Sequence, residues 1–129
     1  MAEPDQQIIS QISNENDIDI RILHFIFCVS ILVPIFAWLG IFSPNEPAEI
    51  WFQRSGSLVV CSSLYAEIIL LNIRDRNRPT SEGSKTYVDL VNEGTLRKKY
   101  DKKMDCYQKI AYLPLFIGTI IWGYGDLIR

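Results

Sequence analysis

Charged residues are missing from three long stretches of this 129-residue sequence. No Asp, Glu, Lys or Arg lies in Ile22–Phe42 or in Ile110–Gly125, and Glu67 is the one charged residue in Ser55–Leu71. At about 1.5 Å per helical residue, these stretches reach about 24 to 31 Å, close to the hydrocarbon thickness of a bilayer. We therefore predict an all-α integral membrane protein with three transmembrane helices. The alternative, a soluble three-helix bundle, would need polar residues every three to four positions, which "FIFCVSILVPIFAWLGIF" lacks.

The sequence also lacks the groupings that catalysis and metal binding need. It has one histidine, no pair of carboxylates within a predicted span, no cluster of metal-ligand residues and no phosphate-binding loop. We expect no enzymatic activity, no metal and no cofactor. The cysteines do not predict disulfides, because Cys28 and Cys61 lie in membrane spans and Cys106 lies in a basic loop. The segment before the first span is acidic, which argues against a cleaved signal peptide.

Lysine and arginine are concentrated in one part of the chain. Ten of the thirteen lie in Arg74–Lys109, whereas the loop between the first two spans holds only Arg54. Basic segments stay on the cytoplasmic side, so we predict a cytoplasmic N-terminus and an external C-terminus in a bacterial inner (plasma) membrane. The predicted divisions are an acidic amphipathic segment (1–20), the first span (21–43), an external loop (44–54), the second span (55–73), a basic cytoplasmic loop and helix (74–109) and the third span with the external C-terminus (110–129).

Both cytoplasmic segments are predicted to be helical. Residues 4–16 place three isoleucines on one face of a short acidic helix. From Thr95 onward, apolar residues step by three and four into the third span, which predicts a helix that begins at Thr95 and extends that span into the cytosol. The acidic and basic segments either pair with each other or are separately solvated, and the sequence favours neither. The apolar positions of the extension are Leu96, Tyr100, Met104, Tyr107 and Ala111.

Glu67 is the residue in the second span that most directly indicates a functional site. A carboxylate inside a span costs about 2–3 kcal/mol or more on insertion scales, and it commonly faces protein or a water-filled cavity. His24, near the cytoplasmic end of the first span, is its predicted partner. A structural contact and a pore-lining role are equally favoured. Small and hydroxyl residues accompany Glu67, so the pore or cavity candidates are Ser55, Ser62, Ser63, Glu67 and His24.

A basic cluster lies at the base of the third helix. Such a cluster either retains the topology and attracts anionic lipid, or docks a soluble polyanion such as an oligonucleotide or a nucleotide. The first interpretation is the more general one. The ligand-binding candidates for the second are Arg97, Lys98, Lys99, Lys102 and Lys103.

The string "GYGD" near the C-terminus spells part of a potassium selectivity filter. A filter needs Thr two residues before the first Gly, where this chain has Ile121, and an inner helix after it. Three residues follow Asp126. We predict instead that Gly123 and Gly125 end the third helix, and a potassium-selective channel is the least favoured function.

The strings "WFQRSGSLVVCSSLYAEIILL" and "GTIIWGYGDLI" resemble small three-helix membrane proteins of bacteria and the membrane effectors of antiphage defence systems such as Hailong. The resemblance implies a small homo-oligomeric ion channel that is held closed by a nucleic-acid ligand made by a companion nucleotidyltransferase. It would place ligand contacts on the basic cytoplasmic residues.

Three helices of this size cannot enclose a pore alone, so we expect a homo-oligomer, and a tetramer rather than a monomer. The leading hypothesis is an ion-conducting membrane effector gated from the cytosol, with an oligonucleotide or nucleotide ligand and a cytosolic nucleotidyltransferase as partners. The alternative is a non-conducting membrane anchor or adaptor that binds a partner through its basic cytoplasmic helix.

Overall fold

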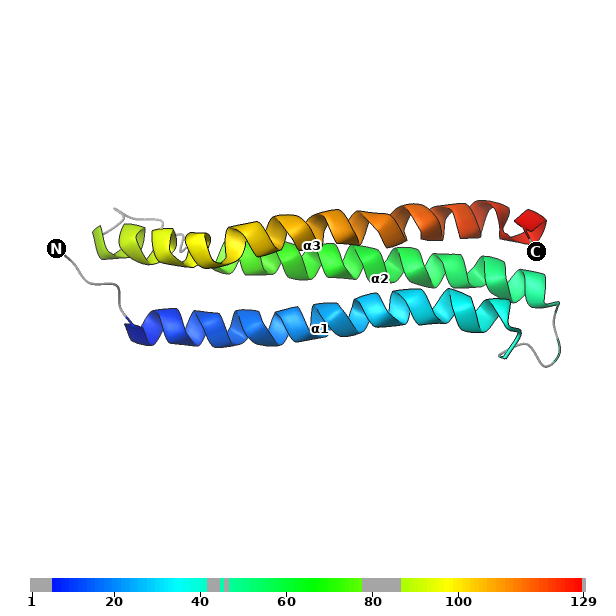
Figure 1. Ribbon diagram of the computed structural model, residues 1–129, viewed down its shortest axis with the longest axis horizontal. Helices are drawn as coiled ribbons and strands as arrows, with labels where there is room; N and C mark the ends of the chain where they lie inside the picture. The colour runs from blue at the N-terminus through cyan, green and yellow to red at the C-terminus, as the bar shows by residue number, and fades with distance from the viewer. Residues whose placement is uncertain (1–5, 42–44, 46, 78–86, 129) are drawn as a thin grey trace.

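The computed structural model describes residues 6–41, 45, 47–77 and 87–128. Within these ranges, all regular secondary structure is α-helical and forms three helices: α1 (Gln6–Trp38), α2 (Ala48–Arg76) and α3 (Tyr87–Ile128). The helices lie side by side, with α2 between α1 and α3, and consecutive helices run in opposite directions (Figure 1). We name the end of the bundle where α1 and α3 begin the N-terminal end.

All three helices are long and apolar enough to cross a membrane. Large apolar side chains point away from the bundle, and Phe25, Leu113 and Phe116 are each more than 60% exposed. Water would oppose such exposure, whereas lipid tails are as apolar as the side chains themselves. The prediction of an all-α chain with three helices of membrane-spanning length is thus confirmed.

The buried positions of each helix recur every seven residues. This spacing keeps one seam of a helix facing its neighbour and is the repeat of left-handed coiled coils. Several seam residues are small or polar rather than large and apolar, so the helices can approach closely. The repeating buried positions are Asn16, Leu23, Ser30 and Ala37 on α1; Phe52, Val59, Ala66 and Ile73 on α2; and Met104, Ala111, Gly118 and Gly125 on α3.

Glycine sets the closest approach, which is between α2 and α3. A Cβ atom added at Gly56 would lie 2.5 Å from the backbone nitrogen of Trp122 and 2.6 Å from the carbonyl oxygen of Gly118. A Cβ atom at Gly125 would lie 2.9 Å from the Cα atom of Gln53. Any side chain at Gly56 would therefore force the two backbones apart.

Two predictions about α3 are wrong. The helix begins at Tyr87 rather than at Thr95, and the Thr95 hydroxyl donates to the carbonyl oxygen of Val91 at 2.9 Å inside the helix. The other end continues through Gly123 and Gly125 to Ile128. Backbone groups in a bilayer have no water to bond with, so a continued helix is favoured over a glycine-terminated one.

The other predicted boundaries also shift. The predicted external loop (44–54) is shorter than expected, because α2 begins at Ala48. No break separates the acidic N-terminal segment from the first span, since α1 is one helix from Gln6 to Trp38. Arg74 and Arg76, predicted in the basic loop, are the last turn of α2. The first two residues of the predicted N-terminal helix (4–16) and residues 78–86 of the predicted basic loop lie outside the described residues.

Candidate functional site: the polar flank and the basic face

Buried polar contacts join the helices at the N-terminal end. Asn16 on α1 donates its side-chain N–H to the Asn77 side-chain oxygen at 2.8 Å, in a buried contact. Arg76 reaches the Asp19 carboxylate at 2.9 Å and the Glu15 carboxylate at 3.2 Å. The acidic part of α1 is thus paired with the end of α2.

Tyr100 makes the corresponding link between α1 and α3. Its side chain is fully buried, and its hydroxyl lies 2.8 Å from the Ser13 hydroxyl and 3.3 Å from the Asp17 carboxylate. Lys99 donates to the Ser13 hydroxyl at 2.7 Å. Of the predicted ligand-binding residues, Lys99 is therefore engaged in holding α1 and α3 together.

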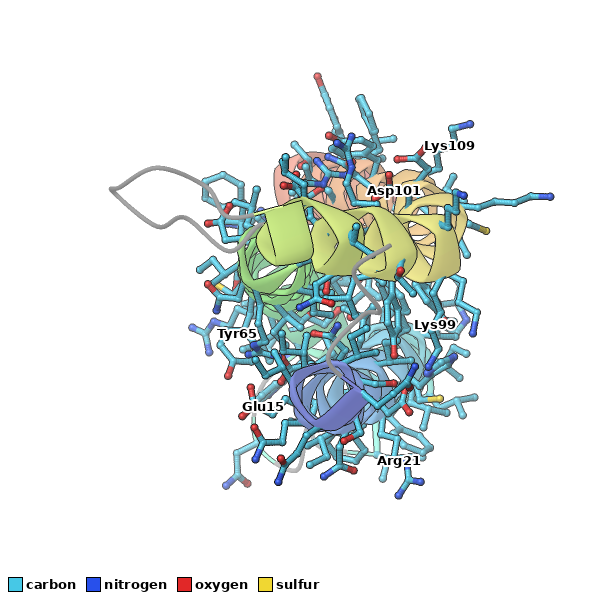
Figure 2. All side chains as sticks on the ribbon, turned by 90° about the vertical axis from the view of Figure 1, so that its left-hand side faces the viewer. Glu15, Arg21, Tyr65, Lys99, Asp101 and Lys109 are labelled. Atoms are coloured by element: carbon cyan, nitrogen blue, oxygen red, sulfur yellow. The ribbon has the colours of Figure 1, made fainter. Side chains whose placement is uncertain are left out.

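The remaining basic candidates fall into two groups. Arg97 pairs within α3, with Glu93 at 3.8 Å and Asp101 at 3.4 Å. The second group is exposed and has no polar partner among the described residues. It consists of Lys98, Lys102, Lys103 and also Lys109. Figure 2 shows Lys109 pointing outward from α3.

Lys98, Lys102 and Lys109 follow one line along α3, because spacings of four and seven residues fall on one helix face. We name these three lysines the basic face. It is turned away from the buried Tyr100 and leads directly into the exposed apolar surface at Leu113.

The predicted pore serines pack inside the single chain. The Ser55 hydroxyl donates to the Phe52 carbonyl at 2.6 Å, and the Ser63 hydroxyl donates to the Val59 carbonyl at 2.9 Å. The Ser62 hydroxyl lies 2.6 Å from the Ser30 hydroxyl on α1. These hydroxyl groups are satisfied by their own helix and its neighbour, and among the described residues none of them bonds to Glu67 or His24.

Glu67 has a buried carboxylate oxygen, Oε1, without a hydrogen-bond partner in the described part of the chain. It occupies the same strip of α2 as Gln53, fourteen residues before it, and Arg74, seven residues after it. Gln53 packs on Gly125 and Arg74 lies 3.8 Å from Asp105, so this strip faces α3. The antiparallel register of these contacts puts Glu67 at the level of residues 107–115.

By this register, hydrogen-bonded polar side chains lie near the level of Glu67. Arg74 donates to the Gln108 side-chain oxygen at 3.0 Å, and Gln108 donates to the Tyr112 hydroxyl at 3.2 Å. A polar pocket of about 310 Å³ lies next to them, lined in part by Arg74, Arg97 and Gln108. We name Arg74, Gln108, Tyr112 and Glu67 the polar flank. The sequence prediction missed Gln108 and Tyr112, although their four-residue spacing at the start of an apolar helix was a usable signal.

The predicted pairing of His24 with Glu67 is not found. One ring nitrogen of His24, Nδ1, lies 2.7 Å from the Ile20 carbonyl, and the other, Nε2, lies 3.3 Å from the Tyr107 hydroxyl on α3. The rings of His24 and Tyr107 meet edge to face with centroids 5.4 Å apart. His24 on α1 and Glu67 on α2 therefore each face α3, and His24 bonds to Tyr107 of α3 rather than to Glu67.

The "GYGD" segment is helical, so its carbonyl groups point along the helix axis and do not line an ion pathway as in a selectivity filter.

No family model, curated protein or solved structure matches this chain. The fold and the apolar helices define the class, an all-α protein built as a multi-pass membrane protein.

Proposed function

We propose that this protein is a homo-oligomeric, ion-conducting membrane effector that is gated from the cytosol by a polyanionic ligand. The single observation that carries the proposal is the continuity of α3. One unbroken helix bears the exposed basic face at one end and, by the register of α2 and α3, passes the level of Glu67 and its buried oxygen Oε1 further along. Binding at the lysines can therefore act directly on the helix that packs beside the polar flank.

The proposed orientation follows from charge. The N-terminal end carries the basic face and the acids of α1, and basic segments are retained in the cytosol. We propose that this end is cytoplasmic and that α3 extends there as a helical rod, with the C-terminus outside. The ligand would be an oligonucleotide or a nucleotide, made by a cytosolic nucleotidyltransferase in an antiphage defence system.

The role proposed for Glu67 is electrostatic. A buried carboxylate oxygen without a hydrogen-bond partner, such as Oε1 of Glu67, is costly at membrane depth, and carboxylates there commonly lie where ions or protons pass. In an oligomer, the polar flank would supply a charged position next to a pocket that is lined by polar side chains. The stoichiometry we propose, a tetramer, would repeat this flank around a common axis.

The test is ion flux through the purified oligomer in liposomes. Glu67→Gln preserves the shape and removes the charge, so assembly should survive while flux and toxicity on expression fall at least tenfold. Glu49→Gln makes the same change of charge at an exposed position in the first turn of α2 and should conduct like the parent.

Ligand binding is tested on the same preparation with a fluorescent single-stranded oligonucleotide. Replacing Lys98, Lys102 and Lys109 together by Gln should weaken binding and reduce the salt slope by about 2, at about 0.7 per neutralised phosphate. Arg97→Gln is the control, because Arg97 already pairs with Glu93 and Asp101. Unchanged flux in Glu67→Gln together with unchanged binding in the triple variant would contradict the proposal.

The second candidate is a non-conducting membrane anchor or adaptor that binds its partner through the basic face. The observation that favours it is the internal satisfaction of Ser55, Ser62 and Ser63, which leaves few hydroxyl groups to line a pore. An anchor would bind the oligonucleotide or a protein partner and give no flux in liposomes, with or without ligand.

A further inference from the structure

Two neighbouring edges of α3 differ in polarity along its membrane-spanning part. One edge carries a polar residue every seven positions, a spacing that keeps these residues on one face of the helix. The residue after each of them is a leucine or an isoleucine. We name the first set the polar edge and the second the apolar edge; both are exposed, and they consist of Tyr112, Thr119 and Asp126, and of Leu113, Ile120 and Leu127. A helix surrounded by lipid alone would be apolar on both edges, so the polar edge is suited to other surroundings.

Contacts with α2 place the polar edge on the same side of the bundle as the polar flank. Near the N-terminal end, Gln108 accepts a hydrogen bond from Arg74 and donates one to the Tyr112 hydroxyl at 3.2 Å. Near the other end, the side-chain N–H of Gln53 donates to a backbone carbonyl of α3 at 3.2 Å. Gln53 and Arg74 lie on the strip of α2 that holds Glu67, so this strip and the polar edge follow the same side of the α2–α3 pair.

The register matches the strip and the polar edge level by level. The side chains of Arg74 and Asp105 lie 3.8 Å apart, and steps of seven residues in opposite directions along the two antiparallel helices start from this pair. The first step puts Glu67 at the level of Tyr112. The third step ends near the C-terminal end of α3, where Gln53 packs against the helix. The buried oxygen of Glu67 is therefore part of a row of polar levels that are about 10 Å apart.

This side of the α2–α3 pair is turned away from α1. The apolar groove between α1 and α3 is lined on α3 by other residues, among them Ile110, Leu113 and Ile117. Figure 2 shows Asp101, which lines the polar pocket, on the side of α3 away from α1, and Lys99 on the side toward α1. The polar edge is therefore open to the surroundings of the chain, and α1 does not cover it.

The charges on this side have one sign within the span. Glu67 and Asp126 are the only charged residues in 55–71 and 110–126, and Arg74 at the N-terminal end is paired with an aspartate of α3. Rings of acidic side chains favour cations in channels. We infer that the proposed oligomer conducts cations, along a water-filled path between copies of the chain that is lined by the polar edge of α3 and the Glu67 strip of α2. This inference rests on the proposed function, and it leaves the apolar edge to lipid.

The path is tested by the reaction of introduced cysteines with a cationic, water-soluble methanethiosulfonate, on the purified oligomer in liposomes. In the background for this test, Cys28, Cys61 and Cys106 are all replaced by Ser. Thr119→Cys should react, because only a hydrated thiol ionises to the reactive thiolate, and the added positive charge should abolish most of the flux. Ile120→Cys is the matched control on the apolar edge and should neither react nor lose flux. Intact mass measures the reaction independently of flux.

The ion class is tested by the reversal potential of planar bilayers in a gradient of potassium chloride. The parent should favour potassium over chloride. Asp126→Asn should lower this preference about threefold, the size expected for one unit charge a few ångströms from an ion in water. Leu127→Asn introduces the same side chain on the apolar edge without a change of charge and should keep the preference.

The outcomes distinguish this inference from the proposed function. A parent without flux, with or without oligonucleotide, would remove the proposed function and the inference with it. A conducting parent in which Thr119→Cys reacts no faster than Ile120→Cys would overturn the path along the polar edge and leave conduction standing. A preference of the parent for chloride, or an unchanged preference in Asp126→Asn, would overturn the assignment of cations to this path.

Discussion

At Gly56 the backbones of α2 and α3 approach so closely that a single methyl group decides their spacing. The methyl carbon of alanine would lie 2.5 Å from the backbone nitrogen of Trp122, a rigid atom that cannot move aside alone. Close packing of small residues is a main source of stability between membrane helices, because apolar burial gains little against lipid.

We predict that Gly56→Ala destabilises the α2–α3 contact by about 2 kcal/mol, in the range of overpacked sites. Gly123→Ala is the matched control, because nothing lies within 4 Å of its added Cβ atom. It should be neutral or stabilising by up to about 1 kcal/mol through helix propensity. The measurement is the midpoint of unfolding in a titration with SDS, and equal midpoints for the two variants would show that α2 and α3 are packed differently.

The residue scale also shows why part of the candidate site was missed. Glu67 stood out in the sequence because a charge within an apolar stretch is visible without any structure. Its surroundings were not visible, because the register of α2 against α3 decides that Gln108 and Tyr112 lie near it. The pairing with His24 failed for the same reason, since sequence distance from the membrane boundary gives depth and not the direction around a helix.

At the scale of helices, the buried Asn16–Asn77 pair ties α1 to α2 at one register. Each residue is at most 3% exposed, so removing one leaves the group that it bonded, the Asn16 N–H or the Asn77 oxygen, buried and unpaired. Single buried polar groups of this kind commonly fix the register of helix bundles. Arg76 strengthens the layer through its contact with the Asn16 oxygen at 3.2 Å.

We predict that Asn16→Ala and Asn77→Ala each destabilise the chain by about 1–3 kcal/mol, the cost of an unpaired buried polar group. The double variant should cost less than the sum, because no amide is then left without its partner. The exposed Asn14 and Asn72 provide controls on the same helices, and their alanine variants should stay within about 0.5 kcal/mol of the parent. Additive costs for Asn16 and Asn77 in SDS unfolding would contradict the pairing.

The presence of the three helices could be predicted from this sequence, whereas the side of each helix that packs against its neighbour could not. Charge-free stretches of membrane length predict spans through their length alone. In a bilayer, however, the outward face is as apolar as the seam, so hydrophobic periodicity does not separate Phe116 from Ile121. The seam is marked instead by small residues every seven positions, such as Ala111, Gly118 and Gly125, a spacing that the sequence prediction did not use. The start of α3 was predicted at Thr95 from a local capping signal, but the helix begins at Tyr87 and continues through Thr95.

At the scale of the whole molecule, the bundle is longer than a bilayer is thick. The 42 residues of α3 extend about 63 Å at 1.5 Å per residue, about twice a hydrocarbon core. The excess lies at the N-terminal end, where Asn16, Arg76 and Tyr100 form polar contacts that would be costly in lipid. The N-terminal end is therefore suited to water rather than lipid, and it projects from one side of the membrane.

We predict that this end faces the cytosol, because it holds most of the lysine and arginine of the chain. Cys106 is exposed in this end, so in spheroplasts it should resist a membrane-impermeant maleimide and react once the cells are permeabilised. Asp126→Cys, combined with Cys106→Ser, places the thiol at the opposite end of α3 and should react in intact spheroplasts. The reverse labelling of the two variants would invert the orientation. It would put the basic face outside the cell, where a cytosolic polyanion could not reach it, and the gating proposed here would fail with it.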